Sequence, residues 1–500
     1  MPRVSEAVDD TTPLGGARID VPARIGWLLR CHRTVGGLSL RQMSTSLREH
    51  DIRLSSTTLG RIESEGQRSS AALDGYAAVL GLPEGVLRAS VDSMCRAFGY
   101  APGAPSDSAA RSLEGYGAAV DAVSDGAPVG GAWLRFARFH AAPNGFGLPT
   151  GLMDPLVRRL VHELLRSTTT AHITRYGALL ELLGSPYRPL VETFVRAQVL
   201  APGTPRIDWL TSVLSDAPTA PTLAWCAGLL DHEADHVVQA GSWALQSMLV
   251  AGGLSAADWA TVVPAFHRAW HDGAADPDVR RTALTQLWQA FPPPLRLATG
   301  RTCNVAVDPV PTPHSWVRGR DNAHYEWASA VSRTACRRMS QSEEPLLERL
   351  VFEAAFDPRG VRKVIARFQL LASPFGDTIV EVMLESADRA PDAEARRSIL
   401  QAAAFLHRGQ PVRTVDRLLA SADGHDFIAG LTLAGQAGLR LPGSAVTRGL
   451  SADGATVRKT LGALGQAEDP RLADLATGEA DAEVRAGARW WREHGGRVVV

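Results

Sequence analysis

The chain has few cysteines, almost no lysine and no long apolar run. Its five cysteines are scattered over 500 residues without a Cys-x-x-Cys pair, which argues against a disulfide framework and is typical of a reducing compartment. No stretch approaches the roughly 18 consecutive apolar residues of a membrane-spanning helix, and residues 1–22 contain no apolar run typical of a signal peptide. We therefore expect a cytoplasmic protein without membrane contacts.

An excess of charge of one sign is also missing. The formal net charge is −1, so affinity for nucleic acid requires a local basic patch rather than the overall field. Phosphate-binding and nucleophile motifs are absent as well: the chain contains no G-x-x-x-x-G-K-[S/T], no G-x-G-x-x-G after a strand and no G-x-S-x-G. We accordingly expect neither an enzyme nor a cofactor.

What the chain does contain is helical periodicity, which predicts an all-α fold. Composition divides it further. Residues 1–22 are polar and predict a disordered arm, and residues 23–98 contain closely spaced short helices. The Gly/Pro/Ser/Ala-rich residues 99–131 predict a linker with room for one helix, and residues 132–500 predict a large helical repeat region. Prolines interrupt this region at 291–320, where we expect a loop.

A recurring sequence motif predicts structural repeats: an acid, a short apolar residue and a basic residue stand at the start of a helix. It occurs at 276–284, 357–363, 392–397, 454–459 and 481–485, and more loosely at 235–240. Val238 and Val279 are 41 residues apart, and Val361 follows after 82 more. Acids cap helix N-termini, and a period near 40 predicts a HEAT-like α-solenoid in which the valines face the next repeat. The alternative is ordinary helix-start chemistry in an arginine-rich chain.

The N-terminal helices have one polar and one apolar face each. Ser39 is placed to cap a helix over residues 40–47, and a further helix over 55–63 turns Leu59 and Ile62 inward. Its small polar residues and Arg61 then face outward. Helices around 73–80 and from 83 complete a five-helix bundle.

These segments resemble the Cro/repressor-type (XRE) helix-turn-helix family. The resemblance covers about 75 of the 500 residues and rests on the following motifs: Leu28-Leu29-Arg30-x-x-Arg33, Gly37-Leu38-Ser39-Leu40-Arg41-Gln42-Met43, Ser55-x-Thr57-x-Leu59-x-Arg61-Ile62-Glu63, Gly66-x-Arg68 and Leu73…Leu80-Gly81-Leu82. The segment Arg48–Leu54 is longer than the tight turn usual in the family, which bears on the orientation of the second helix.

The resemblance implies a transcription regulator that binds specific double-stranded DNA sites. Ser56, Thr57 and Arg61 would face bases in the major groove, where an arginine pair with guanine contributes about 1–3 kcal/mol of discrimination. The following residues would contact phosphates: Ser39, Arg41, Gln42, Arg33 and Arg68. Glu63 is interpreted as structural and paired to an arginine.

The local charge is modest, with eight arginines against four acids between residues 21 and 70, a balance of +4. We therefore expect a homodimer, with a helical region that dimerises or senses a protein, peptide or small-molecule effector.

Two other functions remain open. The bundle serves protein contacts alone in an interaction scaffold, in which the small domain localises the protein. Alternatively, residues 232–236 read His-Glu-Ala-Asp-His and match the H-E-x-x-H motif of helix-turn-helix proteins fused to zinc peptidases. Asp235 lies where peptidases have an uncharged residue and no third ligand is evident, so we expect no metal and interpret this stretch as a helix start.

Overall fold

In a computed structural model, the chain is helical in the part that the structure describes, which comprises residues 9–16, 18–101, 112–124, 126–142, 147–271, 277–303, 322–409 and 413–500. No β-strand forms within these ranges, and the sole β-type pairing there is an isolated bridge between Ser167 and Val498. The expected all-α fold class is confirmed.

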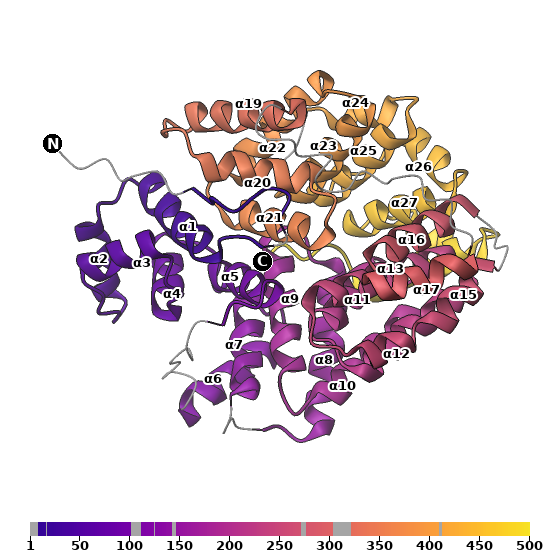
Figure 1. Ribbon diagram of the computed structural model, residues 1–500, viewed down its shortest axis with the longest axis horizontal. Helices are drawn as coiled ribbons and strands as arrows, with labels where there is room; N and C mark the ends of the chain where they lie inside the picture. Colours follow the sequence, from indigo (N-terminus) through magenta and orange to yellow (C-terminus); the bar gives the residue numbers. More distant parts are fainter. Residues whose placement is uncertain are drawn as a thin grey trace.

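Five helices form an N-terminal unit whose helices α2, α3 and α4 lie at one end of the molecule (Figure 1). Local capping sets several of their starts, because Asp20, Ser39, Ser55 and Ser69 each accept a hydrogen bond from a first-turn backbone N–H. The helices are α1 (Val21–Val35), α2 (Leu40–Glu49), α3 (Ser56–Glu65), α4 (Ser70–Val79) and α5 (Val86–Ala97).

A second group of helices follows and forms the lower and right-hand parts of Figure 1. These helices are α6 (Leu113–Ser124), α7 (Gly130–Ala141), α8 (Thr150–Arg166), α9 (Thr169–Leu183), α10 (Arg188–Leu200), α11 (Ile207–Ser215), α12 (Ala220–Gly228), η2 (Leu229–Asp231), α13 (Asp235–Ala251), α14 (Ala256–Ala260), α15 (Val263–His271), α16 (Pro277–Ala290) and α17 (Pro293–Cys303). Neighbouring helices pack in sequence, as α7 does on α9, α11 on α13 and α13 on α16.

The expected linker and the expected proline-rich loop both contain helices. The segment 99–131 includes α6, which is the one helix foreseen there, and α7 begins at its end. Within the proline-rich segment 291–320, the loop prediction is wrong for α17, because Pro293 and Pro294 stand at the first helical positions, where a missing N–H costs little. Residues 304–321 of that segment lie outside the described residues.

The third group of helices forms a regular stack. Its members are α19 (Ala323–Arg338), α20 (Pro345–Phe356), α21 (Gly360–Ala372), α22 (Gly376–Ser386), η4 (Ala387–Arg389), α23 (Ala393–Leu406), α24 (Val415–Ala420), α25 (Gly424–Ala437), α26 (Gly443–Leu450), α27 (Gly454–Gln466), α28 (Leu472–Thr477) and α29 (Ala482–His494). Helices α21, α23, α25, α27 and α29 pack on one another in turn, and each also packs on the helix before it.

The spacing within this stack differs from the expected period. The stacked helices begin at residues 360, 393, 424, 454 and 482, so one helix pair spans 28–33 residues. The period near 40 is wrong here, since short helices and tight loops close each pair. Asp392 and Asp481 cap helices as expected. Of the motif valines, Val238, Val457 and Val484 are buried, whereas Val279 is 37% exposed.

Arginines of the recurring motif form ion pairs between neighbouring helices of the second and third groups. The Arg280 Nε lies 3.2 Å from Asp235 Oδ1, which connects α16 to α13. In the same way, Arg458 Nη1 lies 2.8 Å from Glu483 Oε1 and connects α27 to α29. The motif therefore lies at helix starts and supplies ion pairs between neighbouring helices.

The N-terminal segment lies on the third group of helices rather than forming a disordered arm. Asp10 is buried, and Arg349 of α20 donates hydrogen bonds to the backbone carbonyls of Asp10 and Thr12. The expectation of a disordered arm is therefore wrong for residues 9–16 and 18–20, because distant arginines bind carbonyls between residues 10 and 16 and Ile19 is buried. Residues 1–8 and 17 lie outside the described residues.

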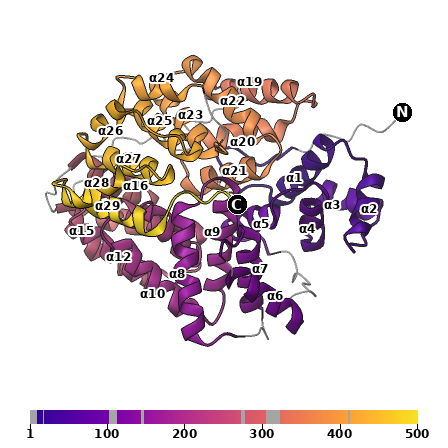
Figure 2. The ribbon, with the colours of Figure 1, turned by 180° about the vertical axis from the view of Figure 1, so that it is seen from behind.

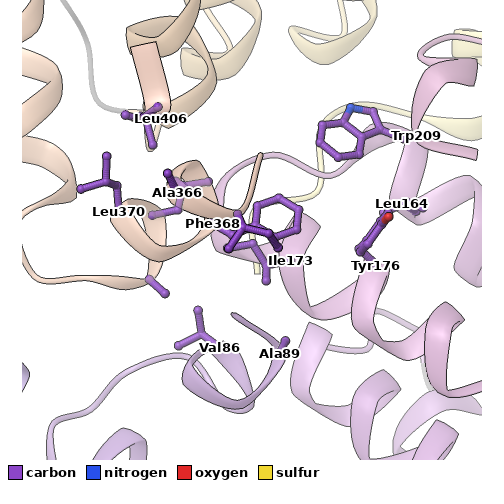
Figure 3. Close-up of a cluster of buried hydrophobic side chains, with 14 of the residues drawn as sticks. Val86, Ala89, Leu164, Ile173, Tyr176, Trp209, Ala366, Phe368, Leu370 and Leu406 are labelled. Carbon is purple, nitrogen blue, oxygen red and sulfur yellow. The ribbon is translucent and has the colours of Figure 1, made fainter. Parts of the chain in front are cut away.

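A single apolar cluster runs through most of the chain and joins the N-terminal unit to the remainder. Figure 3 shows part of it, where Val86 of α5 faces residues of α9 and α21, among them Ile173 and Phe368. The rings of Phe368 and Trp209 stack with centroids 6.2 Å apart. The five-helix unit is consequently held by apolar packing as well as by its connection to α6.

Candidate nucleic-acid interface

The outward face of α3 carries the side chains that the sequence assigned to base contacts. Thr57 and Arg61 are exposed and lie four residues apart, one helical turn, while Ser56 is half-buried. Leu59 and Ile62 are buried on the opposite face, as their spacing predicted. Within the described residues, the Arg61 guanidinium has no ion-pair partner. This face therefore presents hydroxyl groups and one unpaired cation to solvent.

Two close backbone approaches hold α3 against α1. A Cβ atom on Gly26 of α1 would lie 2.1 Å from the Glu63 carbonyl oxygen, so only glycine permits the helices to approach this closely. Gly66 ends α3 with a φ of 64° and a hypothetical Cβ there would lie 1.7 Å from the Pro22 carbonyl oxygen. The orientation of α3 is thus determined by backbone contacts that side-chain rearrangement cannot change.

Helix α2 places its N-terminus beside the exposed face of α3. A Cβ atom on Gly60 would lie 3.4 Å from the Leu40 side chain, so the first turn of α2 contacts α3 next to Arg61. Ser39 and Gln42 form a capping box, in which the Ser39 N–H donates to Gln42 Oε1 at 2.9 Å and the Gln42 N–H donates to Ser39 Oγ at 3.2 Å. The positive end of the α2 dipole therefore lies at the same surface.

Arg41 and Arg48 lie seven residues apart on one face of α2, and both are exposed. Arg53, in the connection to α3, is exposed as well. None of these three forms an ion pair with another described residue. Arg48 and Arg53 were not among the predicted site residues, because they lie in or beside the long connection, where helical periodicity gives no indication of orientation.

The connection between α2 and α3 is longer than a tight turn, and it is nonetheless fixed. The Ser44 hydroxyl of α2 donates a hydrogen bond of 2.6 Å to the Leu54 carbonyl, and Asp51 adopts a φ of 60°. Ser55 then caps α3 by accepting from the Thr58 N–H at 3.1 Å. The two helices pack on each other despite the extra residues.

Arg33 is not available for a phosphate contact, contrary to the sequence prediction. Its Nε and Nη2 atoms donate to the two carboxylate oxygens of Glu63, each at 2.6 Å, and its Nη1 donates to the Leu38 carbonyl at 2.8 Å. The Tyr76 hydroxyl adds a third donor to Glu63 at 2.7 Å. The pair is buried, with 9% and 6% of the side chains exposed, so it joins α1 to α3. The structural role inferred for Glu63 is confirmed.

Arg68 is likewise part of a buried ion pair. Its Nε donates to Asp92 Oδ1 of α5 at 2.7 Å, and only 8% of its side chain is exposed. Burial alone would raise the pKa of Asp92, but its contacts with Arg68 outweigh burial and the pKa falls below its ordinary value. Arg68 therefore stabilises the five-helix unit, and the prediction that it contacts phosphate is wrong.

These pairs change the local charge. Four arginines of this segment are buried in ion pairs: Arg24, Arg30, Arg33 and Arg68. The partner of Arg33, Glu63, is buried as well and is therefore also removed from the exposed charge. The exposed charges between residues 21 and 70 are then four arginines (41, 48, 53 and 61) against three acids (49, 51 and 65), a balance of +1 instead of +4.

The opposite side of the unit is anchored to the third group of helices. Trp27 stacks on Phe375 with ring centroids 6.4 Å apart, and Arg30 Nη2 lies 2.6 Å from Glu344 Oε2. His32 Nε2 lies 2.6 Å from the Ala372 carbonyl, and burial lowers the pKa of His32 to about 4. Figure 2 shows that α2 and α3 nevertheless point away from this contact, at the end of the molecule opposite α29.

Residues 232–236 do not form the single helix that a zinc peptidase motif requires. His232 follows η2 in an extended conformation, and its Nδ1 accepts from the Ala234 N–H at 3.0 Å. Helix α13 begins only at Asp235, so His236 alone of the two histidines is helical. Across the described ranges, no group of three or more His, Cys, Asp or Glu side chains is arranged to hold a metal ion.

A scan of the chain against models of protein families finds no match, and a search of curated proteins finds none either. Among the helices of the described residues, none is long and apolar enough to cross a membrane. The functional interpretation accordingly depends on the geometry of the five-helix unit.

Proposed function

We propose that α1–α5 form a helix-turn-helix domain of the Cro/repressor type and that the protein regulates transcription by binding specific duplex DNA sites. The observation that carries this proposal is the outward face of α3, where Thr57 and Arg61 are exposed beside the capped N-terminus of α2. Helix α3 would enter the major groove while α2 contacts the backbone. Thr57 and Arg61 are not covered by any part of the chain that the structure describes, as a DNA-reading role requires.

The roles divide by residue. Arg61 would pair with a guanine edge and Thr57 would contact a neighbouring base. Ser39, Gln42 and Arg41 would lie against phosphate, where the capping box leaves the Gln42 amide N–H groups outside its own hydrogen bonds. We add Arg48 and Arg53 as phosphate ligands, since both guanidiniums are exposed.

The low charge of the surface favours a dimer on DNA. A balance of +1 supplies little counterion release, so a single domain would bind weakly, and two domains on a palindromic site would double the phosphate contacts. Because apolar packing anchors each domain to its own helical body, the distance between two α3 helices would depend on how the bodies associate.

The large helical region would mediate that association or respond to an effector. The stack of α21, α23, α25, α27 and α29, each with a preceding partner helix, is what an α-solenoid-like repeat would look like at a period near 30. An effector bound there would act through unequal affinity for DNA-competent and DNA-incompetent arrangements.

Measurement of DNA affinity for matched variants tests the proposal. A preferred sequence is first selected from random duplexes with the full chain, and binding is then measured on it and on a scrambled duplex. Arg61→Ala is expected to weaken binding to the selected duplex by about 1–3 kcal/mol, roughly 5- to 150-fold, and to leave scrambled binding almost unchanged. Arg41→Ala is expected to weaken both and to reduce the salt slope by about 1.

Arg492→Ala is the matched control, because Arg492 is also an exposed helical arginine but lies on α29, far from α3. It should bind both duplexes as the unaltered chain does. Equal losses on both duplexes for Arg61→Ala would remove its base-reading role. Failure of the chain to bind any duplex in dilute salt would overturn the proposal.

An interaction scaffold is the second candidate, and the low exposed charge and firm anchoring of the five-helix unit favour it. In that case the outward face of α3 would contact a protein. Genome-wide occupancy separates the two functions, since a regulator occupies discrete palindromic sites and a scaffold gives a diffuse signal.

A further inference from the structure

Three arginines, on α20, at the N-cap of α21 and on α21, hold the segment Asp10–Gly16 by its backbone. Arg349 donates to the carbonyls of Asp10 and Thr12. Arg359 and Arg362 each donate to the carbonyls of Leu14 and Gly16. Figure 1 shows the indigo segment crossing α20 on its way to α1. The carbonyls of residues 10, 12, 14 and 16 are thus bound, along a segment that ends in a turn where the Gly16 N–H donates to the Pro13 carbonyl at 2.9 Å. Contacts with backbone carbonyls are largely independent of the bound sequence.

One side chain of the segment is recognised in a buried pocket. The Asp10 carboxylate is fully buried and accepts hydrogen bonds from Arg24 Nε at 2.9 Å, from the Thr12 N–H at 3.0 Å and from the Asp20 N–H at 3.3 Å. Arg349 Nη1 lies 3.3 Å away. The Thr12 N–H belongs to the segment itself, so the groups outside the segment that meet this carboxylate are two guanidiniums and the Asp20 N–H, which together make a site for a carboxylate.

The pocket would keep part of its charge without the segment. Glu353 of α20 lies between Arg24, Arg349 and Arg362 and balances some of their charge, with Arg24 Nη1 2.8 Å from Glu353 Oε2. Asp357 is also buried and pairs with Arg362 and Arg359. Two carboxylates, Glu353 and Asp357, among the four guanidiniums of Arg24, Arg349, Arg359 and Arg362 leave an excess of positive charge, which the Asp10 carboxylate partly offsets. In the segment, Thr11 and Pro13 are exposed and make no contribution to this recognition.

We infer that this surface of α20 and α21 is a binding site for an aspartate-bearing peptide that turns after its proline, as residues Asp10–Gly16 do, and that these residues occupy it in cis. A partner protein with such a segment would compete with the N-terminal segment for Arg349, Arg359, Arg362 and the carboxylate pocket. Because a tethered occupant has an effective concentration of about millimolar, the cis segment would exclude weak competitors and admit only well-matched ones. This inference does not depend on DNA binding.

The segment bound in this site also contacts the first turn of α1. Asp10 contacts the Asp20 N–H and Arg24, and Asp20 itself caps α1 by accepting from the Ala23 N–H at 3.0 Å. Displacement of the cis segment would therefore remove contacts at the first turn of α1, the helix against which α3 packs. A competing peptide would in this way act on the five-helix unit from the helical body.

A labelled synthetic peptide with the sequence of residues 9–16 tests the inference by fluorescence anisotropy. The full chain carrying Asp10→Asn, in which the cis segment is weakened, is expected to bind the peptide at least tenfold more tightly than the unaltered chain. The same peptide with asparagine in place of Asp10 should bind the variant chain at least tenfold more weakly, and a scrambled peptide should not bind.

Equal binding to both chains, or no binding to either, would overturn the inference. If Asp10→Asn unfolds the chain, as circular dichroism would reveal, Thr12→Val takes its place, because it retains the Asp10 carboxylate and removes the hydroxyl that Arg349 Nη2 contacts at 2.9 Å and that donates to Asp10 Oδ1 at 2.5 Å. That variant should bind the peptide at least threefold more tightly than the unaltered chain. The titration contains no DNA, so its failure would leave the proposed function untouched, and the reverse also holds.

Discussion

Replacement of Arg33 by alanine is expected to destabilise the five-helix unit rather than to weaken DNA binding directly. The substitution removes two hydrogen bonds of 2.6 Å and leaves Glu63 charged, buried and bonded only to Tyr76. Loss of one partner from a buried ion pair costs about 3–5 kcal/mol, mainly because the remaining charge stays desolvated. A loss of this size is comparable to much of the stability of a small unit.

A double-mutant cycle isolates this effect. Glu63→Gln removes the charge that Arg33→Ala would leave unpaired, so the double variant should be less destabilised than the sum of the two single variants by about 1–3 kcal/mol. Because one core runs through most of the chain, global unfolding does not report on the five-helix unit alone. Hydrogen exchange of amides in α1 and α3 gives the free energy of local opening in this unit.

An Arg33→Ala chain with unchanged exchange protection in α1 and α3 and a weaker, less salt-dependent affinity for DNA would contradict this expectation. That result would mean that Arg33 leaves Glu63 in solution and contacts phosphate, as the sequence alone suggested. Additive effects in the cycle would likewise show that the two side chains do not interact.

Three further predictions concern the same unit. Burial lowers the pKa of His32 to about 4 from 6.5. The stability that neutral His32 contributes is therefore complete above pH 6.5, and roughly 3 kcal/mol of it is lost as the pH falls towards 4. Denaturant unfolding at several pH values should show a shallower decline of the unfolding free energy for His32→Gln. Gly66→Ala should prevent α3 from closing on Pro22, and circular dichroism and exchange would report lost helix; an unaltered melting temperature would contradict the close approach. Ser39→Ala removes the capping box with Gln42 and should cost about 1 kcal/mol in thermal unfolding, whereas an unchanged stability would show that water replaces the cap.

Much of the local structure could be predicted from the sequence, because it depends on neighbours along the chain. Helical spacing placed Leu59 and Ile62 inside α3 and Thr57 and Arg61 outside, and serine at position 39 capped α2 as expected. Periodicity also predicted the all-α class. Failures at this level came where the local rule was ambiguous, as at Pro293, which begins a helix as readily as it interrupts one.

Only the tertiary structure decided which charges face solvent. An exposed arginine and a buried, paired one look the same in a helical sequence, since the partner is remote: Arg68 meets Asp92 from 24 positions away, and Arg24 meets Glu353 from 329 positions away. The same distance hides the attachment of residues 10–16 to α20 and α21. Side-chain direction follows from local periodicity, but pairing between charges depends on contacts that exist only after the chain has folded.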